Sequence, residues 1–417
     1  MKIKIEKSYV NCYYIMLLSI FMMGYVLRSS ILPGAIGYTN IIFYVCMSII
    51  LMRWVRCINK NIIVVAIIFG IVLCVDLSKT SDIYKSITSL VGFVLPLLLF
   101  CVDYSKIIED KEKFIVKCIK IINFFAIVVF IYIILDLFST SALTKSLSTV
   151  FLKLESIIPK RTGYLQFRAG SYLGHALYTK HFILMFYILN MLYYITTSKY
   201  LMNIIVVHII SIIGIALTGS KLGIMMILFL TLYYNSKNKY MIINFALIFL
   251  GVLILGYLGV FDIVINRFMT TTLTTNRTAA GELVSSVLPS IKLVGGMGAD
   301  LSDYLLKRFN SSEVTAAMEY PFKIWAYRYG LIATALILFE IYIHTLYRFI
   351  KSKNMTFIIS FLIIIAETSA FNQLVYNPDL FILIILWNII LNNILDLYEE
   401  KIADEEIEIC NTNYGEN

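Results

Sequence analysis

The sequence predicts an all-α polytopic integral membrane protein that forms a single membrane domain over residues 1–417. Hydrophobic residues make up 60% of the chain, charged residues make up only 15%, and the mean hydropathy is +0.84. Soluble globular chains carry roughly 25% charged residues, so this chain has more apolar surface than a water-soluble core can hide. The apolar residues also gather into runs close to the roughly 20 residues that a helix needs to cross a bilayer.

Polar segments separate these apolar runs, which define 12 candidate transmembrane helices. The first run resembles a signal peptide, but no small-x-small cleavage site follows it, so we expect an uncleaved first span. Of the six prolines only Pro96 falls clearly inside a span, so we expect the spans to be unbroken. The runs lie at 10–27, 35–52, 61–76, 86–102, 116–137, 181–197, 202–218, 222–234, 240–259, 329–347, 355–371 and 378–396.

The basic residues predict that both termini are cytoplasmic, because short cytoplasmic loops are enriched in lysine and arginine. With the N-terminus inside, 18 basic residues fall on inner segments and four on short outer segments, which favours this orientation. The four outer residues are Arg28, Lys79, Lys85 and Lys221. The acidic segment 397–417 then forms a cytoplasmic tail, which we expect to be a solvated or frayed helix.

Two outer segments are too long to be simple connectors: 138–180 between the fifth and sixth spans, and 260–328 between the ninth and tenth. Connections longer than about 12–15 residues are usually functional or disordered. Both segments contain apolar residues at helix-like spacing, so we expect short amphipathic helices along the outer membrane face. They also hold the other 13 basic residues, whose charge the orientation rule does not explain.

The stretch "RTGYLQFRAGSYLGHALYTKH", residues 161–181, places cations, histidines and glycines between apolar spans. Arg168 is its central candidate, because a planar guanidinium binds two phosphate oxygens at once. Gly170 lets the backbone approach a ligand closely, and Arg161 and His175 are further candidates for binding. Contact with lipid headgroups, which requires no substrate, is the alternative role of Arg168, and a packed, hydrogen-bonded side chain is the alternative for His175.

Four further elements carry candidate residues. Lys221 begins the eighth span, where the helix macrodipole disfavours a cation unless an anion lies nearby. Arg277 lies in the second long outer segment, and Gly296 and Gly298 permit a tight turn or backbone amides that face an anion. Glu319 precedes the tenth span and is a candidate general base. The alternatives are a lysine that snorkels to water, a solvated charge, a plain turn and a helix-entry acid.

Nothing in the sequence predicts a metal or a cofactor. The seven cysteines are scattered without CxxC or CxxH spacing, which argues against a metal site or a disulfide framework. The outer segments contain no DxD pair. We therefore expect chemistry without a divalent metal, and we expect no nucleic-acid partner.

In this order and on these segments, the five elements resemble the bacterial O-antigen polymerase and O-antigen ligase superfamily. Its members have two large periplasmic loops and recurring features: "RxG" before a helix, "TxSR" at a helix start, a loop arginine, "GxG", and an acidic residue or histidine eleven positions before a glycine. The resemblance covers about 115–350, and the matching residues are Arg168 and Gly170; Thr218, Ser220 and Lys221; Arg277; Gly296 and Gly298; and Glu319 with Gly330.

The resemblance implies a metal-independent glycosyltransferase of the bacterial inner membrane that joins repeat units carried on undecaprenyl diphosphate. Its partners would be the lipid-linked oligosaccharide, membrane lipids and a chain-length regulator protein. Arg168, Lys221 and Arg277 would hold the diphosphate, and Glu319 would accept the proton of the attacking sugar hydroxyl. Glu319 stands where ligases have histidine, which favours a polymerase, whereas Lys221 replaces the more common arginine.

Three alternatives stay open. An O-antigen ligase is the nearest one within the enzymes. A non-enzymatic flippase or exporter of the lipid-linked repeat unit would suit the number of helices, but it does not account for the two long outer segments. A membrane scaffold without catalysis would leave the outer basic clusters unexplained.

Overall fold

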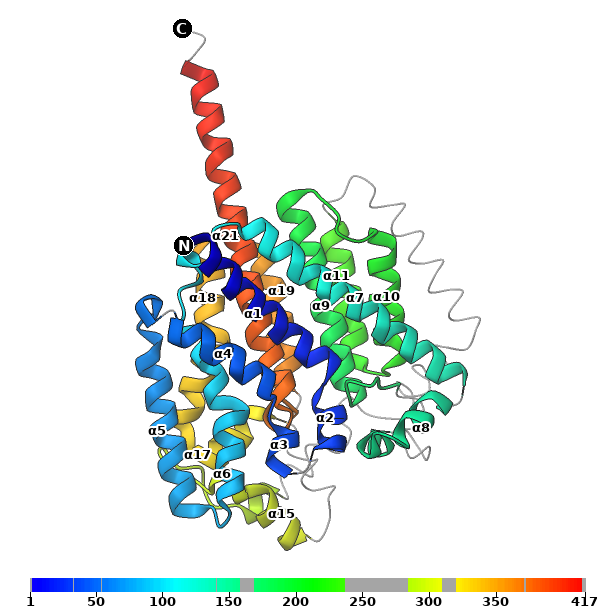
Figure 1. Cartoon of the computed structure of the whole chain (residues 1–417), viewed down its shortest axis with the longest axis vertical. Coiled ribbons are helices and arrows are strands. Elements are labelled where there is room, and N and C mark those ends of the chain that lie inside the picture. The colour runs from blue at the N-terminus through cyan, green and yellow to red at the C-terminus, as the bar shows by residue number, and fades with distance from the viewer. Residues whose placement is uncertain are drawn as a thin grey trace.

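The computed structural model describes residues 2–32, 34–53, 55–139, 141–157, 169–236, 284–309, 320–370 and 373–414, and within these ranges the regular structure is helical, without a β-strand (Figure 1). The all-α prediction is therefore confirmed for the described part of the chain. Arg161, Arg168, Arg277 and Glu319 lie outside the described residues, as do the candidate span at 240–259 and residues 260–283 and 310–319 of the second long outer segment.

Five described helices are long and apolar enough to cross a membrane, or six if one bent pair counts as a single span. This finding supports a multi-pass membrane protein, and the finer prediction of 12 spans is not confirmed. The five are Asn61–Lys79, Ile83–Cys101, Lys111–Phe138, Pro321–Lys351 and Pro378–Asp404, and the bent pair is Val10–Met22 with Tyr25–Ile31. The shorter apolar helices are Ile41–Met52, Ile204–Leu217, Lys221–Asn235 and Met355–Ser369.

Two helices form the centre of the bundle. In α21 (Pro378–Tyr414), 89% of the most apolar 18-residue stretch is buried inside the protein, whereas in α5 (Asn61–Lys79) only 28% of the corresponding stretch is buried. The second central helix, α9 (Ala176–Thr197), packs against α21 and α7 (Lys111–Phe138) and is buried along almost its whole length. Phe21 of α1 (Lys2–Met22) joins these elements, with ring centroids 4.9 Å from Phe125 and 4.8 Å from Phe182.

Polar side chains mark where several helices begin, as expected for residues that accept hydrogen bonds from unpaired helix N–H groups. Asp110 caps α7 by accepting from the Lys113 N–H at 2.9 Å. Asn203 does the same for α10 (Ile204–Leu217), and Asn354 for α19 (Met355–Ser369). Ser220 caps α11 (Lys221–Asn235) by accepting from the Gly223 N–H at 3.2 Å.

The N-terminus and the end of the C-terminal helix lie at the opposite end of the bundle from the described helices of the two long outer segments (Figure 1). The N-terminus and the projecting end of α21 lie at one end, while α8 (Ala142–Ser148) and α15 (Leu301–Phe309) lie at the other (Figure 1). A second short helix, Leu152–Ile157, follows α8 in the first long segment. Which end faces the cytoplasm stays a prediction; the helical course of the tail to Tyr414 is observed.

The expectation of unbroken spans is wrong. The first span bends by 72° between α1 and α2 (Tyr25–Ile31). The fourth changes from α6 (Ile83–Ser89) to a π-helical turn at Leu90–Val94 and a 3-10 helix at Leu95–Cys101. The tenth begins earlier than predicted, as α17 (Pro321–Leu338), and breaks at Gly330. Only the second of these breaks contains a proline, so proline content was a poor guide to them.

Candidate functional site

The glycines of the "LVGGMG" segment interlock with the break in α17. Gly330 has φ +89°, and the N–H groups of Leu331 and Ile332 donate to the carbonyls of Lys292 and Leu293 at 3.0 and 3.1 Å. A Cβ on Gly296 would lie 2.5 Å from the Arg328 carbonyl oxygen. The loop therefore takes over hydrogen bonds that a continuous helix would make internally, and only glycine fits at this contact.

Asp76 anchors the other side of the same loop. Its buried carboxylate accepts from the Ala299 N–H at 2.9 Å, from the Thr80 hydroxyl at 3.1 Å and from the Tyr329 hydroxyl at 3.3 Å. Gly298, with φ +64°, is the residue that allows this approach, because a Cβ there would lie 2.8 Å from the Asp76 carboxylate. The structure thus uses both predicted glycines to pack the loop between α5 and α17.

A cavity of about 420 Å³ opens beside this loop, between α15, α17 and the end of α5. Three lysines line it, Lys79, Lys292 and Lys307, together with Asp300 and Asp303. Lys85 forms ion pairs with both aspartates, at 2.9 Å with Asp300. Because Lys85 partly neutralises the two aspartates, the three lysines that line the cavity give it a net positive charge.

Asp300 links this loop to the start of the fourth span. It accepts from the backbone N–H and the hydroxyl of Ser81, both at 2.9 Å. Partial burial raises the pKa of Asp300, but the hydrogen bonds from Ser81 and Lys85 outweigh it, so the pKa lies below the usual range for aspartate. Asp300 therefore stays ionised and holds the loop at neutral pH.

Three further predicted residues lie near the starts of helices: Gly170 and His175 before α9, and Lys221 at the start of α11. The Ala169 N–H, next to Gly170, donates to the Leu217 carbonyl at 3.0 Å, just before the "TGSK" turn that leads to Lys221. His175 caps α9 by accepting from the Leu177 N–H at 3.2 Å, which is a structural role that the sequence argument had left open. Lys221 is half-buried in the first turn of α11.

Lys180 was predicted to lie in the first long outer segment but is buried inside the bundle. It pairs with Glu367 of α19, and His181 lies beside them with Nε2 3.9 Å from the Glu367 carboxylate. Gly223 makes room for this lysine, because a Cβ there would lie 2.7 Å from the Lys180 Cδ. The apolar neighbours of Lys180 on a helical pattern were the signal that should have placed it inside.

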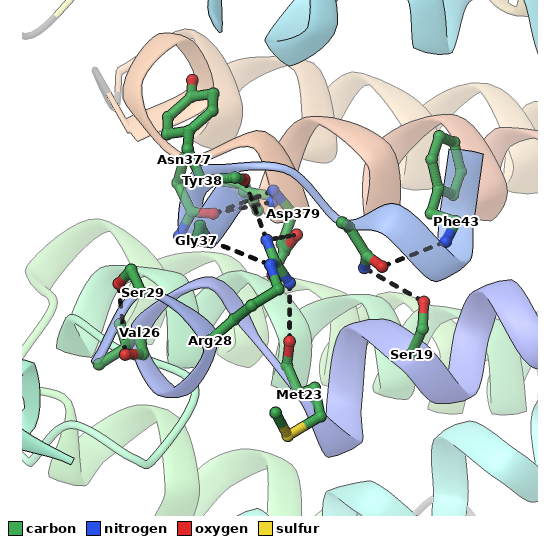
Figure 2. Close-up of polar contacts among 12 residues, drawn as sticks. Ser19, Met23, Val26, Arg28, Ser29, Gly37, Tyr38, Phe43, Asn377 and Asp379 are labelled. Atoms are coloured by element: carbon green, nitrogen blue, oxygen red, sulfur yellow. Dashed lines mark hydrogen bonds and ion pairs between the residues drawn. The ribbon is translucent and has the colours of Figure 1, made fainter. Parts of the chain in front are cut away.

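Arg28 was likewise assigned to a short outer segment, and Figure 2 shows it in a closed network with Asp379. Its Nη2 donates to Asp379 Oδ1 at 3.0 Å and its Nη1 to Oδ2 at 3.2 Å. The remaining donors reach the backbone carbonyls of Met23, Gly37 and Tyr38. This network ties the bend between α1 and α2 to the start of α21.

Arg328 is a buried cation that the sequence analysis did not single out. It lies on α17, two residues before the break at Gly330, and is 7% exposed. Its Nη2 donates to the Ser302 hydroxyl at 3.2 Å, and its guanidinium lies 5.3 Å from the centre of the Tyr376 ring. An arginine within an otherwise apolar span was the available signal.

The structure therefore brings together Gly296, Gly298 and Gly330 in one place, and it places the residue next to Gly170 against the end of α10 in another. The described residues contain no cluster of three histidine, cysteine or acidic side chains arranged to hold a metal ion. The chain matches no protein-family model, no curated protein and no solved structure.

Proposed function

We propose that the protein is a bacterial inner-membrane glycosyltransferase of the O-antigen polymerase type, which joins oligosaccharide repeat units carried on undecaprenyl diphosphate at the periplasmic face. One observation carries the proposal among the described residues. The "GxG" loop and the glycine of the tenth span, two elements of the family pattern, pack on one another beside a lysine-lined cavity of about 420 Å³. That arrangement gives the paired glycines a physical reason to occur together.

The chemistry of the proposed reaction matches the residue types on these segments. The leaving group is a lipid diphosphate, and cations stabilise the negative charge that develops on it in the transition state. Arg168, Lys221 and Arg277 supply this charge, and Arg161, Gly170 and His175 lie close to Arg168 in the sequence. Glu319 accepts the proton of the attacking hydroxyl, and its usual pKa of about 4.3 makes it an ionised base at neutral pH.

The broken spans favour a second candidate, a flippase or exporter of the same lipid-linked unit. Transporters often bind their substrates where membrane helices are interrupted, and the spans here are interrupted at Gly24, at Leu90–Cys101 and at Gly330. The interruption at Gly330 is filled by the "LVGGMG" loop. We therefore keep the polymerase as the first proposal.

The glycan ladder of cells that lack the gene tests both proposals. A polymerase predicts collapse to lipid that carries one repeat, with rescue by the restored gene. Periplasmic lipid-linked polymer would indicate a ligase, single units trapped inside would indicate a flippase, and an unchanged ladder would refute all three. Arg168→Ala and Glu319→Ala should abolish the ladder at normal protein levels in the membrane, whereas Lys145→Ala, at an exposed lysine of α8, should not.

A further inference from the structure

Arg328 is buried without the partners that a buried guanidinium normally has. An arginine carries five N–H donors, but among the described residues this side chain makes one hydrogen bond, from Nη2 to the Ser302 hydroxyl at 3.2 Å. Its Nε–H is buried and has no hydrogen-bond partner in the described part of the chain. Among the residues that the structure describes, no carboxylate lies within 4.0 Å of its guanidinium.

Asp76 attracts Arg328 electrostatically from a distance, but it accepts no hydrogen bond from the guanidinium. The two charges interact electrostatically without forming an ion pair. Both oxygens of Asp76 already accept hydrogen bonds, from the Ala299 N–H, from Thr80 and from Tyr329. Burying an ion costs free energy unless it is paired and hydrogen-bonded, so the unmet donors of Arg328 call for a partner from outside the chain.

The surroundings of Arg328 suit a small oxyanion. The Ser302 and Tyr376 hydroxyls lie 3.1 Å apart and hydrogen-bond to each other, and the Ser302 hydroxyl lies 3.2 Å from Nη2 of the guanidinium. The Tyr376 ring holds the guanidinium in place by a cation–π contact, which is effective within about 6 Å. Two hydroxyls can turn their protons toward an anion, and the fork of an arginine matches the oxygens of a phosphate.

We propose that Arg328, Ser302 and Tyr376 form a binding site for a phosphate oxyanion. The lysine-lined cavity is built on the same two helices, α15 and α17, and adds positive potential nearby without being lined by Arg328 itself. The site itself does not depend on the proposed function; only the assignment of its phosphate to a lipid-linked substrate rests on that function. A lipid-linked diphosphate and a phospholipid headgroup present the same oxygens, and the experiment below separates them.

Binding of inorganic pyrophosphate to the full chain in a phosphate-free detergent is the first test, because a phospholipid bilayer would itself supply phosphate oxygens. The wild type should bind, and Arg328→Gln should weaken binding by about tenfold or more, equivalent to about 1.4 kcal/mol. Arg328→Lys should retain part of the affinity, because a lysine supplies the charge without the fork. Lys323→Gln is the matched control: it removes one positive charge from an exposed position on the same helix and should leave binding unchanged.

Equal affinity of wild type and Arg328→Gln would overturn the site, and so would a wild type that does not bind pyrophosphate. If Arg328→Gln does not fold, Ser302→Ala and Tyr376→Phe take its place, and unchanged affinity in both would overturn the proposal. The second arm compares undecaprenyl diphosphate with phosphatidylglycerol. Tighter binding of the diphosphate assigns the site to the substrate, and equal binding assigns it to a headgroup. Because pyrophosphate binding requires no polymerisation, an unchanged glycan ladder would refute the proposed function and leave this result standing.

Discussion

Two buried arginines near the same end of the bundle are held in opposite ways. Arg28, 5% exposed, gives its guanidinium donors to one carboxylate and three backbone carbonyls. Arg328, 7% exposed, makes one hydrogen bond to a hydroxyl and lies over a tyrosine ring. The two arginines are almost equally buried and carry the same charge, so they differ in how many of their N–H donors have hydrogen-bond partners among the described residues. Arg28 is part of the fold, whereas Arg328 retains donors for a ligand.

The Arg28–Asp379 network should carry the largest stability effect. Arg28→Met leaves Asp379 buried without its cation, and breaking such a pair costs about 3–5 kcal/mol. Thermal unfolding of the purified protein in detergent measures the loss. Asp303→Asn is the control, because the Asp303 side chain is 50% exposed and an exposed pair contributes only about 0–1 kcal/mol. Equal losses in the two variants would contradict a structural role for Arg28.

Gly330→Ala should be the next most damaging change, because it disturbs the break that follows Arg328. The residue has φ +89° and ψ 173°, and a Cβ would lie 2.9 Å from the Leu293 carbonyl oxygen. Backbone strain of this kind costs about 1–3 kcal/mol. Gly70→Ala is the control, since Gly70 is in α5 with no atom near its Cβ position. There alanine should stabilise the helix by up to about 1 kcal/mol, so unfolding temperatures should move in opposite directions.

Arg328→Met should change stability little or raise it, in contrast to Arg28→Met. Replacing a buried ion by an apolar side chain of similar size is often neutral or stabilising, and here no carboxylate among the described residues is left unpaired by the change. The same detergent melting experiment compares the two variants directly. A loss for Arg328→Met as large as that for Arg28→Met would show that Arg328 is a structural residue and would weaken the comparison.

The sequence predicted the helical membrane class, because composition reports it directly. For Gly296 and Gly298 it predicted a tight turn or backbone amides that face an anion, and it did not predict their packing against α17 and Asp76. It could not predict the ion-pair partners of Arg28 and Lys180. Their partners, Asp379 and Glu367, are 351 and 187 residues away, and a charge at the edge of an apolar run looks alike whether it faces water or a distant carboxylate. The break at Gly330 was missed for a related reason, since the loop that fills it comes from another segment.

The smallest expected effect concerns the exposed contact of Asp300 with Lys85 and Ser81. Because the pKa of Asp300 is lowered in the folded protein, its contribution is complete above its unfolded value of about 3.9 and is lost as the pH falls through the folded value. Asp300→Asn should therefore unfold slightly more easily at pH 6 and should lose less stability than the wild type on acidification. Melting curves from about pH 5 to pH 3 measure this difference. Asp404→Asn, at an exposed position of α21, controls for the loss of one carboxylate. If the stability of wild type and Asp300→Asn falls equally on acidification, Asp300 does not hold the loop beside Arg328. Among the described contacts, those of Asp76 and Gly330 would then hold it.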